Sequence, residues 1–389
     1  MTRLVLRRGH DRRVRGGHPW IFSNEIESVD GPQDAGVAVA VFAADGQRLG
    51  TGYYNPHSLI AARLLSRHDE SIDTPDFYVS ALKKALEYRA RTCGELDALR
   101  LAHGEGDGLP GLVVDRYGDV LSVQLLTAGM EARRAVLIEA LREVLAPRAI
   151  VARNDSVARE LEGLPRGTEV LYGTAPEPVP VSINGLQLVV DVMAGQKTGL
   201  FLDQRENCRR LEGLVQDAEV LDLFCYAGAW SLHAAAYGAR SVTGVDVSAA
   251  AIRSAEQNAS LNGLAERCRF VAGDVFDVLR GERGRRFGTV ILDPPAFIKS
   301  RRHLDEGKKG YLTVNRRALE RVAPGGFLVT CSCSHHLDRP TFLALIAQAA
   351  HQARRSVRLV EMRGQAADHP ILPACPETDY LKCLILFVD

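Results

Sequence analysis

The sequence predicts an α/β protein whose C-terminal half is a doubly wound, mostly parallel sheet, preceded by a β-rich domain and a small α+β domain. Two observations support this fold class. After about residue 203, segments with helical and strand periodicity alternate, as in a parallel sheet covered by helices on both faces. Before residue 74, short β-branched runs are instead separated by turn signals such as Gly16-Gly17 and Asn55-Pro56.

Composition limits the classes of protein to consider. The chain has 389 residues, of which 46% are hydrophobic and 25% charged, so it can bury more than one core. No run approaches the ~20 apolar residues that span a bilayer, and the arginine-rich N-terminus does not resemble a signal peptide. Eight cysteines without CxxC pairs argue against disulfides and structural zinc. These features predict a soluble cytoplasmic protein with no metal and no membrane partner.

Residues 1–73 are the predicted first domain, which is locally basic although the formal net charge of the chain is zero. The first twenty residues hold six arginines against the single acid Asp11. Guanidinium groups pair with phosphates and stack on bases, so Arg12 and Arg15 are candidate RNA contacts. The alternative is an ordinary β domain with a solvated arginine cluster.

Residues 74–178 are the predicted middle domain. A helix is expected to begin at Pro75, a second one to span residues 130–145, and short strands to lie around them. The segment from Gly104 to Gly111 looks like a phosphate loop. However, no Gly-Lys-Ser/Thr ends it, and a strand follows where a P-loop needs a helix. A tight structural turn or a substrate-facing loop is the better interpretation.

Residues 179–389 are the predicted third domain, which opens with a hairpin that turns at Asn184-Gly185. The expected strands are 219–224, 241–246, 269–271, 289–292 and 327–330, and the expected helices are 203–214, 230–237 and 248–261. In such sheets, ligands bind beyond the carboxyl ends of the strands. Four aspartates stand at successive strand ends here: Asp222, Asp246, Asp274 and Asp293.

The first turn of this sheet favours one class of nucleotide cofactor. Asp246 can accept hydrogen bonds from both ribose hydroxyls of an adenosine, and Asp274 can take the adenine amino group. A nicotinamide cofactor needs a bare glycine turn for its pyrophosphate, but Phe224 and Tyr226 crowd the turn before Gly228. S-adenosylmethionine has no pyrophosphate and is therefore the predicted cofactor. An N-cap is the alternative role for each aspartate, and for Asp274 in particular.

The fourth strand is followed by Asp293-Pro294-Pro295-Ala296-Phe297. The two prolines stiffen the backbone after an acid, and Phe297 can stack on a planar base. This run resembles the D/N-P-P-aromatic motif that marks the target-base pocket of class I methyltransferases at this strand end. The motif alone suits methylation of an exocyclic amine as well as methylation of carbon.

Two thiols, Cys331 and Cys333, follow the fifth predicted strand. Carbon-5 of a pyrimidine is a poor nucleophile, so a thiolate must first add to carbon-6, and a base must later remove the carbon-5 proton. A cysteine at this strand end is placed for that attack. Periodicity does not choose between the two thiols, because residues two apart in a strand share a face.

Several motifs in one order resemble the PUA-containing ribosomal RNA cytosine-C5 methyltransferases. They are Arg15 to Phe22, Gly50 to Asn55, Glu105 to Leu112, Lys197 to Arg205, Asp222 to Gly228, Asp293 to Phe297, Ser332-Cys333-Ser334, His369-Pro370 and Tyr380-Leu381-Lys382. The resemblance covers nearly the whole chain. It implies an RNA-binding PUA β-barrel, a small α+β domain and a Rossmann-like class I methyltransferase domain with a mostly parallel seven-stranded sheet. It also implies 23S rRNA, naked or partly assembled, as the substrate.

The resemblance assigns roles to individual residues. Cys333 is the implied nucleophile, and Asp293 contacts the cytosine ring beside the cofactor, with Pro294, Pro295 and Phe297 lining the pocket. The residues implied to bind S-adenosylmethionine are Asp222, Phe224, Tyr226, Gly228, Asp246, Asp274 and Asp293, with Phe201, Gln204 and Arg205 in an adjoining lid or wall. A paired cytosine cannot reach the thiol, so the target is expected to be single-stranded or flipped. Related enzymes commonly dimerise, and a homodimer fits the resemblance.

The chain departs from the family pattern in three places. Ala227 and Trp230 stand where Thr and Phe are expected, and Cys331 adds a second thiol. The better-known RNA C5-methyltransferases carry a Pro-Cys pair after the fourth strand, whereas Pro294-Pro295 has no thiol. The base that removes the carbon-5 proton is therefore left open between Asp293, Cys331 and a water molecule.

A basic segment follows the predicted base pocket. Its members are Lys299, Arg301, Arg302, Lys308 and Lys309. We expect them in a loop that can follow an RNA backbone and become ordered on binding. The alternative is a solvated loop with no RNA contact.

Two other functions remain open from the residues. The first is an N-methyltransferase of a purine exocyclic amine in rRNA, in which Cys333 only packs. The second is a non-catalytic RNA-binding assembly factor that has kept the cofactor fold.

Overall fold

The computed structural model describes residues 1–281, 284–298 and 300–389 of the chain. These residues divide into two compact units, and neither is continuous in sequence. The first unit comprises Met1–Val181, Val190–Leu202 and Ala367–Thr378, and the second comprises Ser182–Val189, Asp203–Ala366 and Asp379–Asp389. No helix among the described residues is long and apolar enough to cross a membrane.

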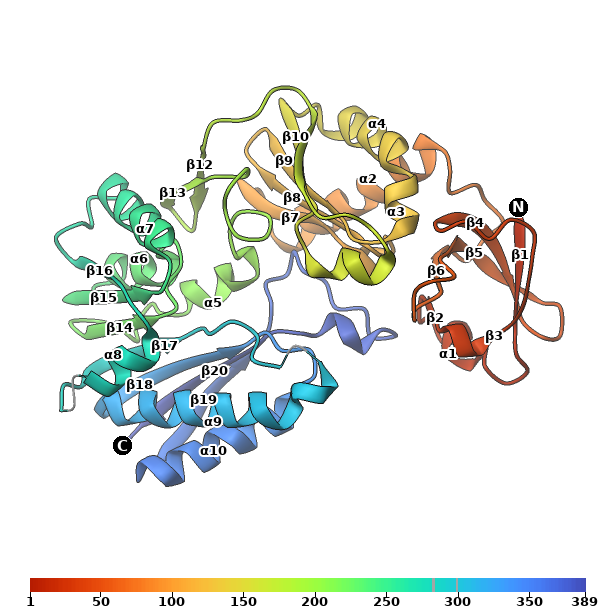
Figure 1. The fold of residues 1–389 in the computed structure, drawn as a ribbon. Helices are drawn as coiled ribbons and strands as arrows, with labels where there is room; N and C mark the ends of the chain where they lie inside the picture. The colour runs from red at the N-terminus through yellow and green to blue at the C-terminus, as the bar shows by residue number, and fades with distance from the viewer. Residues whose placement is uncertain (282–283, 299) are drawn as a thin grey trace. The chain divides into compact units, whose positions relative to one another are not determined.

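The N-terminal part of the first unit is a six-stranded sheet in the order β2-β6-β5-β4-β1-β3 (Figure 1). Its elements are β1 (Thr2–Leu6), α1 (Arg12–Arg15), β2 (Trp20–Ile21), β3 (Ile26–Asp30), β4 (Val37–Phe42), β5 (Arg48–Tyr54) and β6 (Ala62–Ser66). Burial alternates along β1, so Leu4 and Leu6 join Val39 and Val41 in a separate hydrophobic core. The β-rich region predicted from β-branched runs and turn signals is therefore present.

A second sheet, in the order β11-β10-β9-β8-β7, completes the first unit. Its strands are β7 (Ala98–His103), β8 (Leu112–Tyr117), β9 (Val120–Leu125), β10 (Ala149–Arg153) and β11 (Thr168–Tyr172), and its helices are α2 (Pro75–Thr92), α3 (Ala128–Ala132) and α4 (Arg134–Leu145). The prediction of one helix over residues 130–145 was wrong, because the helix is interrupted at Arg133, between α3 and α4. The buried guanidinium of Arg133 donates to the carbonyls of Gly36 and Gly129, both at 2.8 Å, which fixes the residue outside helical geometry.

The glycine-rich segment from Gly104 to Gly111 is a structural turn that joins three parts of the first unit. Glu105 accepts a hydrogen bond of 2.8 Å from the Trp20 indole of β2. Asp107 binds the buried Arg89 guanidinium of α2 through two hydrogen bonds, of 2.5 and 2.7 Å. A Cβ atom on Gly106 would lie only 2.4 Å from the carbonyl oxygen of Pro370, so only glycine fits there. The segment is therefore a tight structural turn, and because Gly106, Asp107 and Gly108 also line a cavity, a substrate-facing role stays a prediction.

A short hairpin precedes the large sheet, as predicted. Its strands are β12 (Val179–Ile183) and β13 (Leu186–Val190). Asn184 and Gly185 have φ angles of 52° and 83°, the left-handed pair that a two-residue type I′ turn requires.

The second unit is built on a seven-stranded sheet in the order β16-β15-β14-β17-β18-β20-β19 (Figure 1). Its strands are β14 (Glu219–Leu223), β15 (Ser241–Asp246), β16 (Cys268–Ala272), β17 (Phe287–Leu292), β18 (Val322–Ser332), β19 (Val357–Arg363) and β20 (Lys382–Val388). The pairings from β16 to β18 are parallel, and β20 is antiparallel to both of its neighbours. The predicted doubly wound, mostly parallel sheet is therefore confirmed.

Alternating side chains give this sheet a core on each face. The helices of the second unit are α5 (Arg205–Arg209), α6 (Ala229–Ala236), α7 (Ala249–Leu261), α8 (Val275–Gly281), α9 (Leu304–Arg321) and α10 (Arg339–Ala353). Val290 and Leu292 of β17 point to the core that contains residues of α8, α9 and α10. Ile291, between them, points to the core that contains Cys208 of α5 and Trp230 of α6.

Two sequence expectations for this unit were wrong. The helix expected over residues 203–214 is only the five-residue α5, after which the chain continues in turns. The basic segment expected as a loop is largely helical, because α9 begins at Leu304 and contains Lys308 and Lys309. Gly307 allows this helix to pack closely, since a Cβ atom there would lie 2.9 Å from the carbonyl oxygen of Phe297. Lys299 lies outside the described residues.

Candidate functional site

The carboxyl ends of five neighbouring parallel strands bring the predicted site residues to one edge of the sheet. Asp274 lies just after β16, Asp246 is the last residue of β15, and Asp222 is the second-last residue of β14. Asp293 follows β17 and Cys333 follows β18. This is the edge at which sheets of this kind bind their ligands.

The turn after β14 is held in an unusual backbone conformation. Phe224, Tyr226 and Gly228 all have positive φ angles, of 66°, 49° and 84°. The amide groups of Phe224 and Cys225 both donate to the Val245 carbonyl, at 2.8 and 3.0 Å, which holds the turn over the end of β15. Left-handed non-glycine residues are costly and cluster at ligand-binding sites, so this turn fits a cofactor-binding role.

Asp246 is fixed by backbone amides from both sides. Its Oδ2 atom accepts from the Tyr226 amide at 3.0 Å, and its Oδ1 atom accepts from the Ser248 amide at 2.9 Å. Each carboxylate oxygen keeps a further lone pair that can accept from a hydroxyl group. The carboxylate is therefore oriented in advance for the ribose contact expected from the sequence.

Asp222 is a buried acid that is only half satisfied. Its Oδ2 atom accepts from the Ser231 hydroxyl at 2.6 Å, whereas Oδ1 has no hydrogen-bond partner among the described residues. Burial raises the pKa of this carboxyl to about 7. A buried carboxylate oxygen without a partner suits a cationic group, such as the ammonium of a bound amino acid moiety. The cofactor predicted from the sequence carries such a group.

Asp274 does perform the N-cap role that was the alternative to adenine binding. Its Oδ1 atom accepts from the amides of Phe276 and Asp277, at 2.6 and 3.2 Å, at the start of α8. The side chain is exposed, and these bonds involve only one of its two oxygens. The cap and a contact to a ligand are therefore compatible.

Asp293 is held by two N–H donors on the same oxygen. Gln204 and Trp230 donate to Oδ2 at 3.0 and 3.1 Å. Behind Gln204, the Asn207 amide donates to Gln204 at 2.7 Å, and Arg363 donates to Asn207 at 3.0 Å. These two donors fix the orientation of the carboxyl group, whose oxygen Oδ2 acts as a hydrogen-bond acceptor.

The two thiols have different surroundings. Cys331 lies inside β18, directly opposite Cys383 of β20, and is completely buried. Burial raises the pKa of the Cys331 thiol well above its usual range. Cys333 follows the last residue of β18 and is partly exposed. In the sequence, the two thiols could not be distinguished because residues two apart in a strand share a face. The strand ends at Ser332, however, so Cys333 lies outside it and this argument does not apply to Cys333.

Ser334 connects the segment of Cys333 to the segment after Asp293. Its hydroxyl lies 2.9 Å from the Tyr311 hydroxyl of α9 and accepts from the Ile298 amide at 3.2 Å. Phe297 packs against Tyr311, with their ring centroids 4.8 Å apart, and is half-buried. Pro294 is buried and Pro295 is exposed. The two candidate catalytic segments are therefore held in register by one buried hydroxyl network.

Comparison with known proteins identifies the family. Residues 99–386 match the family described as S-adenosylmethionine-dependent methyltransferase, and residues 4–67 match the family described as PUA-like domain. The chain belongs to the S-adenosylmethionine-dependent methyltransferases. Its cofactor is S-adenosylmethionine, as the turn after β14 predicted, and its N-terminal sheet is a PUA-like domain.

Similar curated proteins share nearly the whole length of this methyltransferase. Ribosomal RNA large subunit methyltransferase I of Aeromonas hydrophila is 40% identical over 390 residues, and the alignment covers 98% of each chain. The protein of the same name from Aliivibrio fischeri is 41% identical over 387 residues, which is 97% of each chain.

Solved structures support the fold of this methyltransferase over its full length. The structure of SMU.776 complexed with SAH aligns over 100% of both chains, with a TM-score of 0.86 and 22% identity. Trm5b from Pyrococcus abyssi aligns over 70% of this chain and 73% of its own, with a TM-score of 0.54 and 17% identity. At these identities the likeness concerns the fold alone.

The other cofactor residues expected in the methyltransferase fall in both units. Phe201 belongs to the first unit, where the Lys197 ammonium lies 4.7 Å from its ring centroid. Gln204 and Arg205 belong to the second unit, and both are buried. Of these three, Gln204 has a direct contact with a predicted catalytic residue, because it donates to Asp293.

The expected RNA contacts differ in how far their charges are already neutralised. Arg15 pairs with Asp11 and Asp45, at 2.5 and 3.1 Å, whereas Arg12 is exposed on α1. In the second unit, Arg302 lies in a single 3-10 turn that begins at Arg301. Lys309 is exposed and Lys308 is half-buried near the start of α9.

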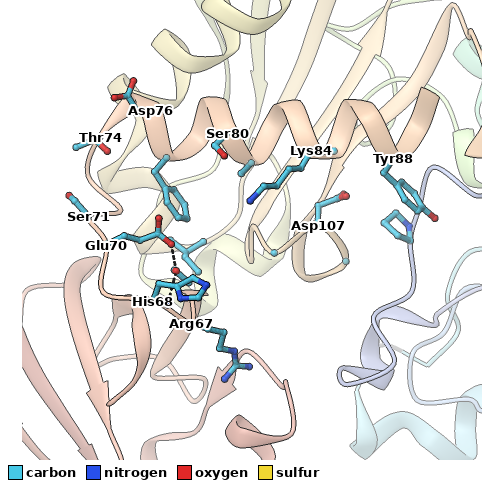
Figure 2. Close-up of a pocket in the computed structure, with 18 residues that line it drawn as sticks. Arg67, His68, Glu70, Ser71, Thr74, Asp76, Ser80, Lys84, Tyr88 and Asp107 are labelled. Atoms are coloured by element: carbon cyan, nitrogen blue, oxygen red, sulfur yellow. Dashed lines mark hydrogen bonds between the residues drawn. The ribbon is translucent and has the colours of Figure 1, made fainter. Parts of the chain in front are cut away.

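A cavity of about 720 Å³ lies in the first unit of the methyltransferase (Figure 2). Lys84 and Tyr88 of α2 line it, together with Arg67 and His68 beyond β6. Acidic side chains, among them Glu70, line the same space, so its charge is mixed. It contains none of the residues predicted to bind the cofactor or to act in catalysis.

Sequence reasoning missed three polar residues of the site. Trp230 was noted only as a departure from the family pattern, and Tyr311 and Lys382 received no role. Lys382 offered a signal in the sequence, since it stands at the head of an apolar run. That run is β20, and the structure shows that Lys382 is buried there. Charged side chains are almost never fully buried without partners.

Proposed function

We propose that this methyltransferase transfers a methyl group to carbon-5 of a cytosine in 23S rRNA through a covalent adduct with Cys333. The observation that carries the proposal is the difference in exposure between the two thiols. Cys333 is partly exposed and follows β18, the strand next to the one that Asp293 follows, whereas Cys331 is buried. The rRNA substrate is supported by the names of the relatives that match over 97 to 98% of the chain. The PUA-like domain supports RNA binding by the first unit.

The reaction requires a defined sequence of bond changes. The Cys333 thiolate adds to carbon-6 of the cytosine, which makes carbon-5 enamine-like. S-adenosylmethionine, held by Asp222, Asp246 and the turn that ends at Gly228, supplies an electrophilic methyl group when bound. A base then removes the carbon-5 proton, the bond between carbon-6 and sulfur breaks, and the thiolate is regenerated.

Asp293 acts in this proposal as a hydrogen-bond acceptor. Gln204 and Trp230 both donate to Oδ2, which fixes the orientation of the carboxyl group, and an aspartate oxygen can accept from the exocyclic amine of cytosine. Complete burial argues against Cys331 as the base for the carbon-5 proton. Asp293 and a water molecule remain the candidates for that step.

The test is transfer of labelled methyl groups to protein-free 23S and 16S rRNA, followed by nucleoside mass spectrometry. The wild type is expected to form 5-methylcytidine in 23S rRNA. Cys333→Ala is expected to form none while still binding S-adenosylmethionine. Cys331→Ala is the matched control and should keep its activity, because that thiol is packed against β20.

Other products would redirect the assignment. The motif from Asp293 to Phe297 also suits an exocyclic amine, so a methylated purine formed without Cys333 would identify an N-methyltransferase. Cofactor binding without methyl transfer to any rRNA would support a non-catalytic assembly factor.

A further inference from the structure

A buried lysine lies beneath the segment that carries Cys333. Lys382 is the first residue of β20 and pairs in register with Ser332, the last residue of β18. Its side chain is only 2% exposed. An ammonium group in such a place loses its hydration, so it is retained only where other groups compensate for that loss.

The contacts of Lys382 hold the backbone on either side of the site. Its Nζ atom donates to the carbonyl oxygen of Ser334 at 2.7 Å and to that of Tyr380 at 2.7 Å. These bonds use two of its three hydrogens. Ser334 directly follows Cys333 and also bonds to Ile298 and Tyr311, so Lys382 supports the segment that positions the thiol.

The Lys382 ammonium binds the carbonyl group of the residue that follows Cys333, so the two side chains belong to one electrostatic environment. Burial lowers the pKa of Lys382 to about 8, and the negative charge of an ionised Cys333 is the largest effect that opposes this shift. Such coupling is reciprocal: if the thiolate favours the ammonium, the ammonium favours the thiolate to the same extent. At neutral pH, a lysine with this pKa is mostly charged.

Three other charged groups that act on Lys382 are already engaged. They are Asp338, Arg339 and Asp379. Arg339 and Asp379 bind each other through hydrogen bonds of 2.8 and 3.1 Å. Asp338 caps α10 by accepting from the Thr341 amide at 2.7 Å. Their effects on Lys382 partly cancel, since two of them are acids and one is a base.

We propose that Lys382 is a positioning residue for methyl transfer, whose buried ammonium stabilises the thiolate of Cys333 and fixes the backbone that presents it. The inference rests on the proposed role of Cys333 as the nucleophile. The thiol proton leaves to solvent, and Lys382 keeps its own protons throughout. Lys382 therefore acts through Cys333 and does not contact the cytosine.

The first test is the pH dependence of Cys333 alkylation in the full-length folded protein. Iodoacetamide rates at the Cys333 peptide are followed by mass spectrometry from about pH 6 to about pH 10. Lys382→Met removes the charge and both hydrogen bonds to the carbonyl groups, whereas Lys382→Gln retains N–H donors without the charge. Both variants are expected to raise the titration midpoint of Cys333 by about one unit, and Lys382→Arg should restore it.

Methyl transfer provides a second readout on the same variants. Lys382→Gln is expected to lose about tenfold of its rate at neutral pH, in proportion to the smaller thiolate fraction, and to recover as the pH rises toward 9. An unchanged Cys333 midpoint in Lys382→Gln overturns the inference. So does a rate loss that is the same at every pH, because that pattern indicates a purely structural role.

A reciprocal measurement covers the case in which the Lys382 variants do not fold. The pKa of Lys382 is measured by NMR, from the pH dependence of its side-chain chemical shifts, in the wild type and in Cys333→Ala. Removing the thiol should lower the pKa of Lys382, and an unchanged value overturns the inference. If Cys333→Ala retains methyl transfer, the proposed function fails, whereas the coupling between the two side chains is judged independently by these titrations.

Discussion

At the scale of single residues, the site depends on hydrogen bonds that orient acids before any ligand arrives. Asp246 is fixed by two backbone amides, and Asp293 by the side chains of Gln204 and Trp230. Orientation in advance lowers the cost of binding and of reaching the transition state. The residues that hold these acids should therefore affect turnover without touching the substrate.

Trp230→Phe tests this idea at Asp293. The ring is retained, but one hydrogen bond to the carboxylate is lost, which we expect to reduce the rate of methyl transfer about tenfold. The affinity for S-adenosylmethionine should change little. The matched control is Trp20→Phe, which loses the indole bond to Glu105 in the first unit and should leave kcat unchanged. Equal losses of kcat in both variants would contradict the assigned role of Trp230.

Asp222 should make stability depend on pH. Its pKa is about 7 in the folded protein, whereas an unfolded aspartate titrates near its usual value of about 3.9. Between these values the folded state holds a proton that the unfolded state has released. Stability from the neutral carboxyl is therefore present at about pH 4 and is lost as the pH rises through 7.

The corresponding variant is Asp222→Asn, compared with the wild type by urea unfolding without ligand. Between pH 5 and pH 8, the free energy of unfolding of the wild type should fall more than that of Asp222→Asn, because the amide does not titrate. Asp119→Asn is an exposed control in which this difference should be absent. If the free energy of unfolding changes equally between pH 5 and pH 8 in both variants, Asp222 is not the group responsible.

At the scale of elements, the turn from Phe224 to Gly228, which follows β14, combines left-handed backbone with close packing. Gly228 has a φ angle of 84°, and a Cβ atom there would lie 3.0 Å from Cβ of Ala255 on α7. Gly228 is also the residue that precedes α6. The turn, α6 and α7 are therefore coupled at one point.

Gly228→Ala is expected to destabilise the protein and to weaken S-adenosylmethionine binding. The left-handed backbone costs an alanine roughly 1 to 2 kcal/mol, and the contact with Ala255 adds to that cost. Gly213→Ala is the control, since Gly213 has a φ angle of 79° with open space around it. It should show only the backbone cost in thermal unfolding and unchanged cofactor affinity in calorimetry. Equal affinities for the cofactor in both variants would argue against a special role for this turn.

At the scale of the whole molecule, the chain contributes distant segments to each unit. Residues 367–378 leave the second unit after β19, pack within the first unit, and are followed by β20. Arg89 anchors this excursion, because its guanidinium binds Asp107 and also donates to the carbonyl oxygen of Asp368 at 2.7 Å. The first unit therefore depends on residues close to the C-terminus.

Arg89→Met should destabilise the first unit by about 3 to 5 kcal/mol, because it leaves Asp107 buried without its partner. Arg91→Met, on the same helix, removes an exposed pair with Glu87 and should change stability by less than about 0.5 kcal/mol. Denaturant unfolding measures both variants in a Trp230→Phe background, in which Trp20 is the fluorescent tryptophan that remains. Similar stabilities would show that the buried pair is not what holds this region.

The sequence by itself predicted the elements whose patterns are local. Strand β15 and the hairpin turn at Asn184-Gly185 followed from periodicity and turn chemistry alone. The order of aspartates along parallel strands also predicted a shared ligand-binding edge, and the structure brings these aspartates to one edge, because parallel strands end at the same side of a sheet. These features depend on neighbours in the chain, which is why one sequence was enough to predict them.

The tertiary structure decided what depends on distant residues. It separated Cys331 from Cys333, since burial follows from where β18 ends and from the pairing with β20. It turned the basic segment into the start of α9, where Gly307 packs against the chain after Asp293. It also placed Lys382 beneath the Cys333 segment. Each of these outcomes depends on contacts between residues far apart in the chain, and periodicity in a single sequence carries no record of such contacts.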